Sequence, residues 1–369
     1  MRGLRTGLPY LCVAAAAWSG AARAQASPIY EIVNLGPGRA VAINHAGEVA
    51  GWRVNQDGTT AAAVFSPAGG SRHAGAGTRA GAINSSGTVA GTAYTAGGER
   101  AFVWNGGNLE LMAFAGGPSW ALAINAPGSV AGAATVASGE VHAFLYSHGR
   151  VQDLGTLGGP WSSAYALNNA GQAAGASLTA AGVFHAFLWD PVTGLRDLGA
   201  LGGASSYAFG LNDLGQVVGH SQVASGFFHA FVWDEETGLR DLGTLGGSAS
   251  FGAAINNSGY VVGYSWVAGS EVTHAFLYRG GVLLDLNSLV AGADGWTLIE
   301  AVGINDAGQI AGTGLLNGIE YAYRLDPIQG GSSELPEVHN PEPSTLILAL
   351  AGLVLVTYGK PAGAGPSRR

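Results

Sequence analysis

A ten-residue pattern that recurs along the chain limits its possible folds more than any other feature. Its fixed points are an asparagine, a glycine three residues later and a second glycine seven residues later, and no copy lacks either glycine. The asparagines, here called the anchors of repeats 1 to 7, are Asn44, Asn84, Asn125, Asn168, Asn212, Asn256 and Asn305. Their spacings of 40, 41, 43, 44, 44 and 49 residues indicate one structural unit copied seven times.

The anchor pattern predicts a tight turn between two strands. An asparagine side chain bonds its own backbone two residues on, and glycine tolerates the positive φ that such a turn needs. An apolar strand precedes the turn and a valine-rich strand follows it in most copies, so each unit opens with a β-hairpin. We interpret the anchors as structural rather than as ligands. The residue two before each anchor is always Ala or Gly, as expected of an innermost strand.

A second signature, an apolar strand, begins 16 to 18 residues after the anchor of each repeat. Its cleanest copies are residues 185–189 and 229–233, and it recurs at 142–146 and 274–278 and more loosely at 100–104, 321–325 and 61–65. Such continuous apolar strands are typical of burial on both faces. A turn and a short strand ending in Asp-Leu-Gly follow, at 153–155, 197–199 and 241–243.

Four strands in each of seven units predict an all-β fold, a seven-bladed β-propeller of four-stranded blades. The 62 glycines among 369 residues argue against a helical fold, because glycine weakens helix interiors. Residues 30–35 match the fourth strand of the unit, which repeat 7 lacks after Leu325. We therefore expect the N-terminal strand to pair with the last repeat, close the ring and hide an open edge.

Three blocks in repeat 5 carry a family resemblance. They are residues 197–203 (DLGALGG), 211–219 (LNDLGQVVG) and 229–231 (HAF), and related blocks recur in order along the chain. Together they resemble the HAF repeat family of extracellular proteins. The resemblance covers nearly all of residues 27–325 and implies export, but it implies no defined activity and carries over no catalytic residue. Repeats 1 and 2 depart from the family because they lack the histidine.

The first 26 residues predict a secretory signal peptide. A basic start with Arg2 and Arg5 precedes an apolar run and small residues at Ala22, Ala24 and Ala26. The alternative is a buried N-terminal helix. The single cysteine, Cys12, lies inside this segment, so the mature chain has no thiol and cannot rely on disulfides.

The C-terminal residues 341–369 resemble a PEP-CTERM sorting signal. Pro341, Glu342, Pro343 and Ser344 precede an apolar run at 346–358 and a basic end. The resemblance implies an exosortase-type processing enzyme as partner, a transient anchor in the membrane through a transmembrane helix, and the cell surface or matrix of a Gram-negative bacterium as destination. The run is shorter than a bilayer needs, and a buried C-terminal helix is the alternative. Residues 326–340, rich in Pro, Gly, Ser and Glu, read as a flexible linker.

The charge of the repeats excludes nucleic acid as a partner. Residues 27–325 contain 10 Arg and no Lys against 20 Asp and Glu. A body with this acidic excess repels phosphate backbones.

The repeated histidines invite a metal or catalytic interpretation. They are His142, His185, His229 and His274, and their spacings of 43, 44 and 45 residues restate the repeat. Equivalent positions on adjacent blades lie too far apart for one ion, so we expect each histidine to bond a neighbouring blade instead. The acids Asp153, Asp197, Asp241 and Asp285 are likewise copies of one another, whereas a catalytic pair should break the symmetry. We expect no metal, no cofactor and no catalytic residue among them.

Function on a repeat scaffold is expected where the copies differ. The candidate binding residues are Trp120, Trp161, Asp294, Trp296 and Glu300. Exposed tryptophans beside polar groups suit sugar rings, and the alternative is that each Trp packs between blades. We favour a non-enzymatic module that contacts extracellular polysaccharide or a surface protein. The alternative is a glycan-directed hydrolase or lyase that uses Glu300, Asp294 or Glu235.

Overall fold

The computed structural model describes residues 29–54, 58–66, 70–114, 116–269 and 272–328. The chain divides into two compact units, residues 1–329 and 330–369, and all described residues belong to the first. The predicted signal peptide and sorting signal, with its apolar run, lie outside the described residues. Within them, no helix is long and apolar enough to span a bilayer. The last strand runs to Pro327, so Asp326 and Pro327 belong to the body and not to the predicted linker.

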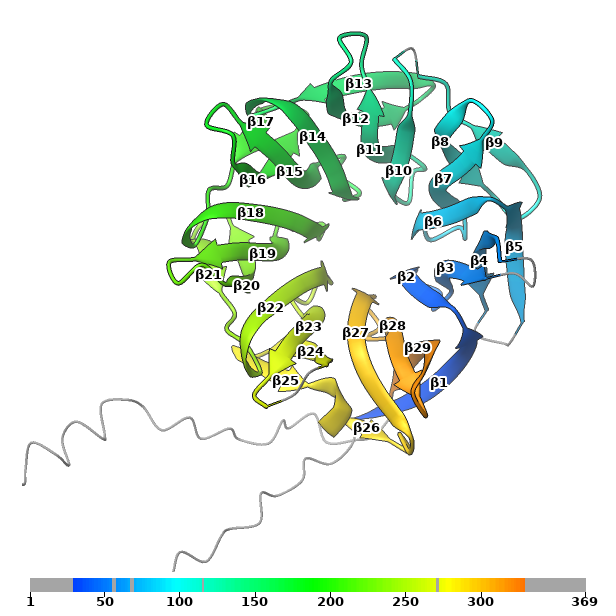
Figure 1. Cartoon of the computed structure of the whole chain (residues 1–369), viewed down its shortest axis with the longest axis vertical. Coiled ribbons are helices and arrows are strands. Elements are labelled where there is room, and N and C mark those ends of the chain that lie inside the picture. The colour runs from blue at the N-terminus through cyan, green and yellow to red at the C-terminus, as the bar shows by residue number, and fades with distance from the viewer. Residues whose placement is uncertain (1–28, 55–57, 67–69, 115, 270–271, 329–369) are drawn as a thin grey trace, which may run out of the picture. The chain divides into compact units, whose positions relative to one another are not determined.

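The described residues form an all-β fold in which each repeat contributes successive antiparallel strands (Figure 1). Repeats 1 to 3 form β2 (Arg39–Ile43), β3 (Val49–Val54), β4 (Thr60–Phe65), β5 (Ser71–Ala76), β6 (Thr78–Ile83), β7 (Val89–Thr95), β8 (Gly98–Trp104), β9 (Leu109–Leu111), β10 (Ser119–Ile124), β11 (Val130–Thr135), β12 (Val141–Ser147) and β13 (Arg150–Gly155). Repeats 4 to 6 form β14 (Gly158–Leu167), β15 (Ala173–Thr179), β16 (Phe184–Asp190), β17 (Gly194–Asp197), β18 (Gly202–Leu211), β19 (Val217–Val223), β20 (Phe228–Asp234), β21 (Gly238–Asp241), β22 (Gly246–Ile255), β23 (Val261–Val267), β24 (Thr273–Arg279) and β25 (Val282–Asp285). A 3-10 turn, η1 (Leu286–Ser288), and β26 (Val290–Ala291) precede repeat 7, which forms β27 (Trp296–Ile304), β28 (Ile310–Leu316) and β29 (Ile319–Pro327).

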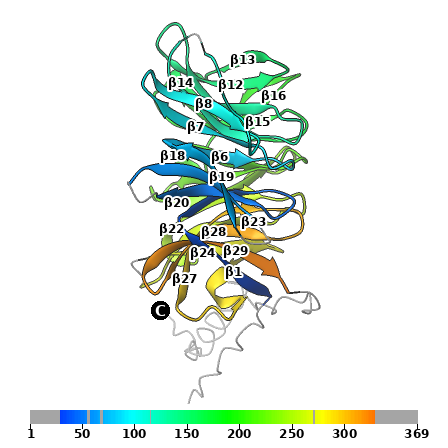
Figure 2. The ribbon, with the colours of Figure 1, turned by 90° about the vertical axis from the view of Figure 1, so that its right-hand side faces the viewer.

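The strands of each repeat pair with one another to form a sheet. The sheets of repeats 1, 2, 5 and 6 have four strands each, and repeats 3 and 4 share one eight-stranded sheet because β12 and β14 meet at a single parallel bridge. Repeat 7 supplies only three strands to its sheet, and β1 (Tyr30–Pro37) pairs antiparallel with its last strand, β29. β1 lies beside β29 in both views of the ribbon (Figures 1 and 2). Tyr30 is buried there, although its two strand partners, Val290 and Pro327, lie 260 and 297 residues further along the chain.

The two invariant glycines have different physical reasons. The glycine three residues after each anchor has a positive φ, between 76° and 90°, as the predicted turn requires. The glycine seven residues after the anchor allows close approach of two strands. A Cβ there would lie 1.9 to 2.1 Å from the carbonyl oxygen of the residue five before the anchor, in every repeat. The first two strands are therefore held at the same separation in all seven repeats.

The core lies between successive repeats. Phe231 and Trp233 of repeat 5 pack in one cluster with Leu188 and Ala186 of repeat 4, and the clusters along the chain repeat this arrangement. One cluster joins the two ends of the repeat series, since Phe65 of repeat 1 packs with residues of repeat 7. The prediction that the second signature is buried on both faces is confirmed, because consecutive residues of β16 and β20 are buried.

Serine hydroxyls link neighbouring repeats. Ser206 Oγ accepts a hydrogen bond from the amide of Ala186, and it donates to the carbonyl of Gly199. Ser162 and Ser250 make the same two bonds in their repeats. These buried hydroxyls satisfy main-chain groups where one repeat passes into the next.

The prediction that each repeated histidine bonds a neighbouring blade is wrong. Nδ1 of His142, His185, His229 and His274 lies 2.7 to 2.8 Å from an oxygen of Asp153, Asp197, Asp241 and Asp285, respectively. Histidine and aspartate belong to the third and fourth strands of one repeat, and these strands pair directly. The physical reason is their register: the aspartate side chain reaches across the ladder to the imidazole. Each pair therefore ties the short outer strand to its own sheet.

Candidate binding site

The anchor asparagines form a continuous chain of hydrogen bonds. The Nδ2 of each anchor donates to the main-chain carbonyl of the next anchor at 3.0 to 3.2 Å, and Asn305 donates to Asn44. The Oδ1 of each anchor accepts from the amide four residues later. Each anchor is at most 6% exposed. Each side chain thus holds its own turn and joins it to the next repeat.

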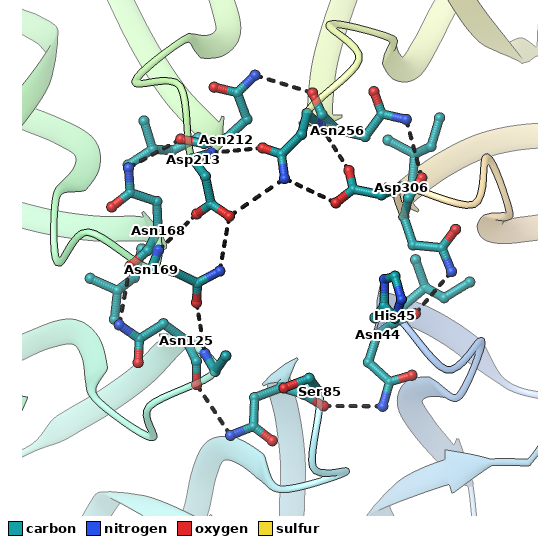
Figure 3. Close-up of a pocket in the computed structure, with 18 of the residues that line it drawn as sticks. Asn44, His45, Ser85, Asn125, Asn168, Asn169, Asn212, Asp213, Asn256 and Asp306 are labelled. Carbon is teal, nitrogen blue, oxygen red and sulfur yellow. Dashed lines mark hydrogen bonds between the residues drawn. The ribbon is translucent and has the colours of Figure 1, made fainter.

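The residues that follow the anchors line a polar cavity of about 220 Å³ (Figure 3). Here Asn169 donates to Asp213, and Asn257 donates to Asp306, both at 2.9 Å. These bonds join one repeat to the next, so the carboxylates are already engaged by protein donors. No group of three or more metal-ligating side chains occurs in the described part of the chain. The bonds from Asn169 to Asp213 and from Asn257 to Asp306 hold neighbouring repeats together.

At two further positions, every repeat has a different combination of residues. They lie five residues before and eight residues after the anchor, and they face each other across the first two strands. We call them the variable pairs. In repeat order they are Arg39 and Trp52, Arg79 and Thr92, Trp120 and Ala133, Ser163 and Ala176, Tyr207 and His220, Phe251 and Tyr264, and Glu300 and Thr313. The close-approach glycine fixes the backbone at this point in each repeat, so the side chains alone distinguish the repeats.

Aromatic side chains gather at the variable pairs of repeats 5 and 6 and at adjacent positions of repeats 4 and 5. With small and aliphatic residues of the other repeats, they line a cavity of about 290 Å³. We call it the aromatic cavity, and its rings are those of Tyr165, Phe209, His220, Phe251 and Tyr264. Successive rings in this order have centroids 4.9, 5.2, 4.9 and 4.9 Å apart. All five are half-buried, so each keeps an accessible surface.

The aromatic cavity is electrically neutral near neutral pH. Burial lowers the pKa of His220 to about 4, because the surrounding rings cannot solvate an imidazolium. Burial also raises the pKa of the Tyr165 and Tyr264 phenols, and for Tyr264 the Glu300 carboxylate adds to the rise while Arg39 opposes it. The tyrosines therefore keep their hydroxyl protons and His220 stays uncharged. The cavity suits a ligand with apolar faces and hydroxyl groups.

Acid is expected to destabilise the protein through His220. The unfolded chain binds a proton below pH about 6.5, whereas the folded chain does so only near pH 4. The free energy of unfolding should therefore fall as the pH drops from 6.5 to 4, by about 3 kcal/mol at most. The H220F variant should not show this decrease in the free energy of unfolding. Urea unfolding of both proteins at pH 7 and pH 4.5 measures the difference, and equal losses in the two proteins would contradict the burial of a neutral imidazole.

Charged groups occupy the variable pairs of repeats 7, 1 and 2. Arg39 donates to Glu300 at 2.6 Å, which joins repeat 1 to repeat 7. The guanidinium of Arg79 lies 5.8 Å from the centroid of Trp52 and 5.6 Å from that of Tyr94. The variable pairs thus divide into an aromatic part and a charged part.

The structure places the five predicted binding residues in different surroundings. Trp120 and Glu300 are members of variable pairs, and Trp120 Nε1 donates to Glu99 at 2.8 Å. Trp161 packs edge-on against Phe184 at 5.3 Å. Phe184 contacts Tyr207, which in turn contacts His220 of the aromatic cavity, so Trp161 is linked to the cavity only through other rings. In contrast, Trp296 packs against the tyrosines of its own repeat, and Asp294 is exposed in the loop before β27; neither lines the aromatic cavity.

The residues of the aromatic cavity could not be predicted from single repeats. Tyr165, Phe209 and His220 lie inside strands that otherwise match the repeat, so they do not stand out as differences between copies. The signal that marks the variable pairs is strong variation between repeats at positions next to those that never vary.

The fold is that of known β-propellers. No protein-family model and no curated protein sequence matches the chain. Among solved structures, it is similar to a puromycin-hydrolyzing peptidase of Mycobacterium tuberculosis (TM-score 0.52, 12% identity, over 82% of this chain and 53% of that chain). It is also similar to the acylaminoacyl peptidase of Pyrococcus horikoshii (TM-score 0.51, 9% identity, over 78% of this chain and 51% of that chain). The likeness spans about half of each peptidase, and at these identities it shows the fold alone: the chain is a β-propeller.

Proposed function

We propose that strands β1 to β29 form a closed seven-bladed propeller in which β1 completes the last blade. Three observations support closure: β1 pairs with β29, Asn305 bonds Asn44, and Arg39 bonds Glu300. The contacts join repeats 7 and 1 at the outer strand, at the anchors and at the variable pairs. A closed ring leaves no open sheet edge for unwanted pairing with another chain.

The propeller is an exported binding module without enzymatic activity, and it contacts polysaccharide of the cell surface or matrix. The terminal signals and the HAF resemblance support export and surface display by way of an exosortase-type processing enzyme. The observation that best supports saccharide binding is the aromatic cavity. Its accessible, half-buried rings can stack on the apolar faces of sugars, and its Tyr hydroxyls can form hydrogen bonds with sugar hydroxyls.

The acids considered for a hydrolase do not gather in one place. Glu300 is paired with Arg39. Glu235, in the turn between β20 and β21, is paired with Arg196 on β17 of the preceding repeat. Asp294 lies in a different loop. Glycoside hydrolysis needs two carboxyl groups on either side of one bond. A binding role therefore has the stronger support.

Replacing one ring of the cavity should weaken saccharide binding. Glycan-array screening of the purified protein identifies a saccharide, and titration calorimetry then compares wild type with F251L. We expect Kd to rise about two- to tenfold, since an aromatic stacking contact contributes about 0.5–1.5 kcal/mol. Y260L is the matched control: it removes a half-buried ring of the same repeat that lies beside Arg279, outside the aromatic cavity.

Two results would overturn the proposal. Release of reducing sugar from a bound glycan would replace binding by hydrolysis. Equal affinity of F251L and wild type for every glycan that binds would remove the aromatic cavity as the site.

A further inference from the structure

Arg79 is an exposed cation without a carboxylate partner in the described part of the chain. It donates no hydrogen bond and forms no ion pair there, whereas Arg39 of the neighbouring variable pair is bound to Glu300. Its guanidinium is held instead between the rings of Trp52 and Tyr94. In a body with twice as many acidic as basic residues, this cation has not been neutralised.

The two rings orient the guanidinium and leave its donors accessible. A cation beside an aromatic face is attracted by the ring quadrupole, and Arg uses its planar face for this contact. The N–H groups then lie at the edges of the plane. Their fork geometry matches the two oxygens of a carboxylate, which can accept both bonds at once. Arg79 therefore presents a preorganised site for a planar anion.

The register places Arg79 beside the aromatic cavity. It occupies in repeat 2 the position that Phe251, a lining residue of the cavity, occupies in repeat 6. Gly81, two residues further along β6, lines the same cavity. Two residues of a strand span about 7 Å, so Arg79 lies within about that distance of a residue that lines the cavity. The two carboxylates of this part of the molecule are engaged, Glu300 by Arg39 and Glu99 by Trp120.

We propose that the ligand is an anionic polysaccharide that contains uronic acids. One sugar ring stacks in the aromatic cavity, and the carboxylate of a neighbouring unit accepts hydrogen bonds from Arg79. This inference rests on the proposed function and deepens it, because it names the chemical class of the saccharide. The aromatic cavity supplies affinity for the sugar ring, and Arg79 supplies the preference for acid.

The test compares acidic oligosaccharides with neutral counterparts of the same length. The probes are hexasaccharides of galacturonate, mannuronate and glucuronate and their carboxyl-reduced forms, titrated by calorimetry at low and at high salt. We expect at least one uronate hexamer to bind about tenfold more tightly than its reduced form, as one charge-assisted hydrogen bond allows. R79Q should abolish this ratio and leave binding of the reduced form unchanged.

R196Q is the matched control. Arg196 is also exposed and also lies over a tryptophan, at 5.1 Å from Trp233, but it is on the outer strand and is paired with Glu235. R196Q should keep the tenfold ratio. Equal binding of acidic and reduced hexamers, persistence of the ratio in R79Q, or no binding of any uronate hexamer would each overturn the inference. If neutral glycans still bind and F251L still weakens them, the proposed function stands without it.

Discussion

A protein that lacks residues 30–37 is expected to melt about 10 °C or more below the wild type and to self-associate. Removal of β1 leaves β29 as an open edge and takes away the partner of Leu325, which is fully buried. It also removes Tyr30, which packs in the cluster that contains Leu286 and Leu298. Exposed strand edges pair with other chains. Differential scanning calorimetry and size-exclusion chromatography measure the two effects.

E31A is the control, because it removes an exposed side chain of β1 and keeps the pairing of its main chain. Its melting temperature should match the wild type. A synthetic peptide of residues 29–38 should restore the melting temperature of the deleted protein if β1 acts by completing the last sheet. A deleted protein that stays monomeric with an unchanged melting temperature would show that the stability of the fold does not depend on β1.

F231A should lower the free energy of unfolding by about 3–5 kcal/mol, the range for removing a fully buried phenylalanine. Phe231 has no exposed surface and fills the space between repeats 4 and 5, in one cluster with Leu188. Urea denaturation followed by tryptophan fluorescence measures the change. Because the core lies between repeats, the substitution should destabilise both repeat 4 and repeat 5.

The exposed ring of Phe227, in the turn between β19 and β20 just before the strand that contains Phe231, supplies the control. F227A should change the free energy of unfolding by no more than about 0.5 kcal/mol. A double-mutant cycle of F231A with L188A should give a coupling of about 0.5 kcal/mol or more if the side chains support each other. Additive losses would mean that each repeat is stabilised on its own.

The local features of the fold could be predicted from the sequence because they depend on neighbouring residues. The turn at Asn212 and Gly215 is a contact within four residues, and the buried strand at 229–233 follows from an unbroken apolar run. The partners of the histidines were predicted wrongly. The spacing of His229 and Asp241 does not reveal that a ladder of two strands brings them together.

The candidate site was predicted only in part. Trp120 and Glu300 could be predicted as site residues because they differ from the other repeats, and both are members of variable pairs. Arg79 could not be predicted, because nothing in its own strand shows that Trp52 of the preceding repeat lies beside it. A functional pair of this kind is defined by the contact between repeats rather than by either residue.

By itself, the sequence determined the repeat, its turns and the strands that must be buried, because backbone conformation and hydrophobic pattern act over a few residues. The tertiary structure alone decided which side chains meet across repeats, as with Arg39 and Glu300, 261 positions apart. The rings of the aromatic cavity likewise come from repeats 4 to 6, whose first strands converge. Their assembly depends on the packing of whole sheets against one another, and no short stretch of sequence records that packing.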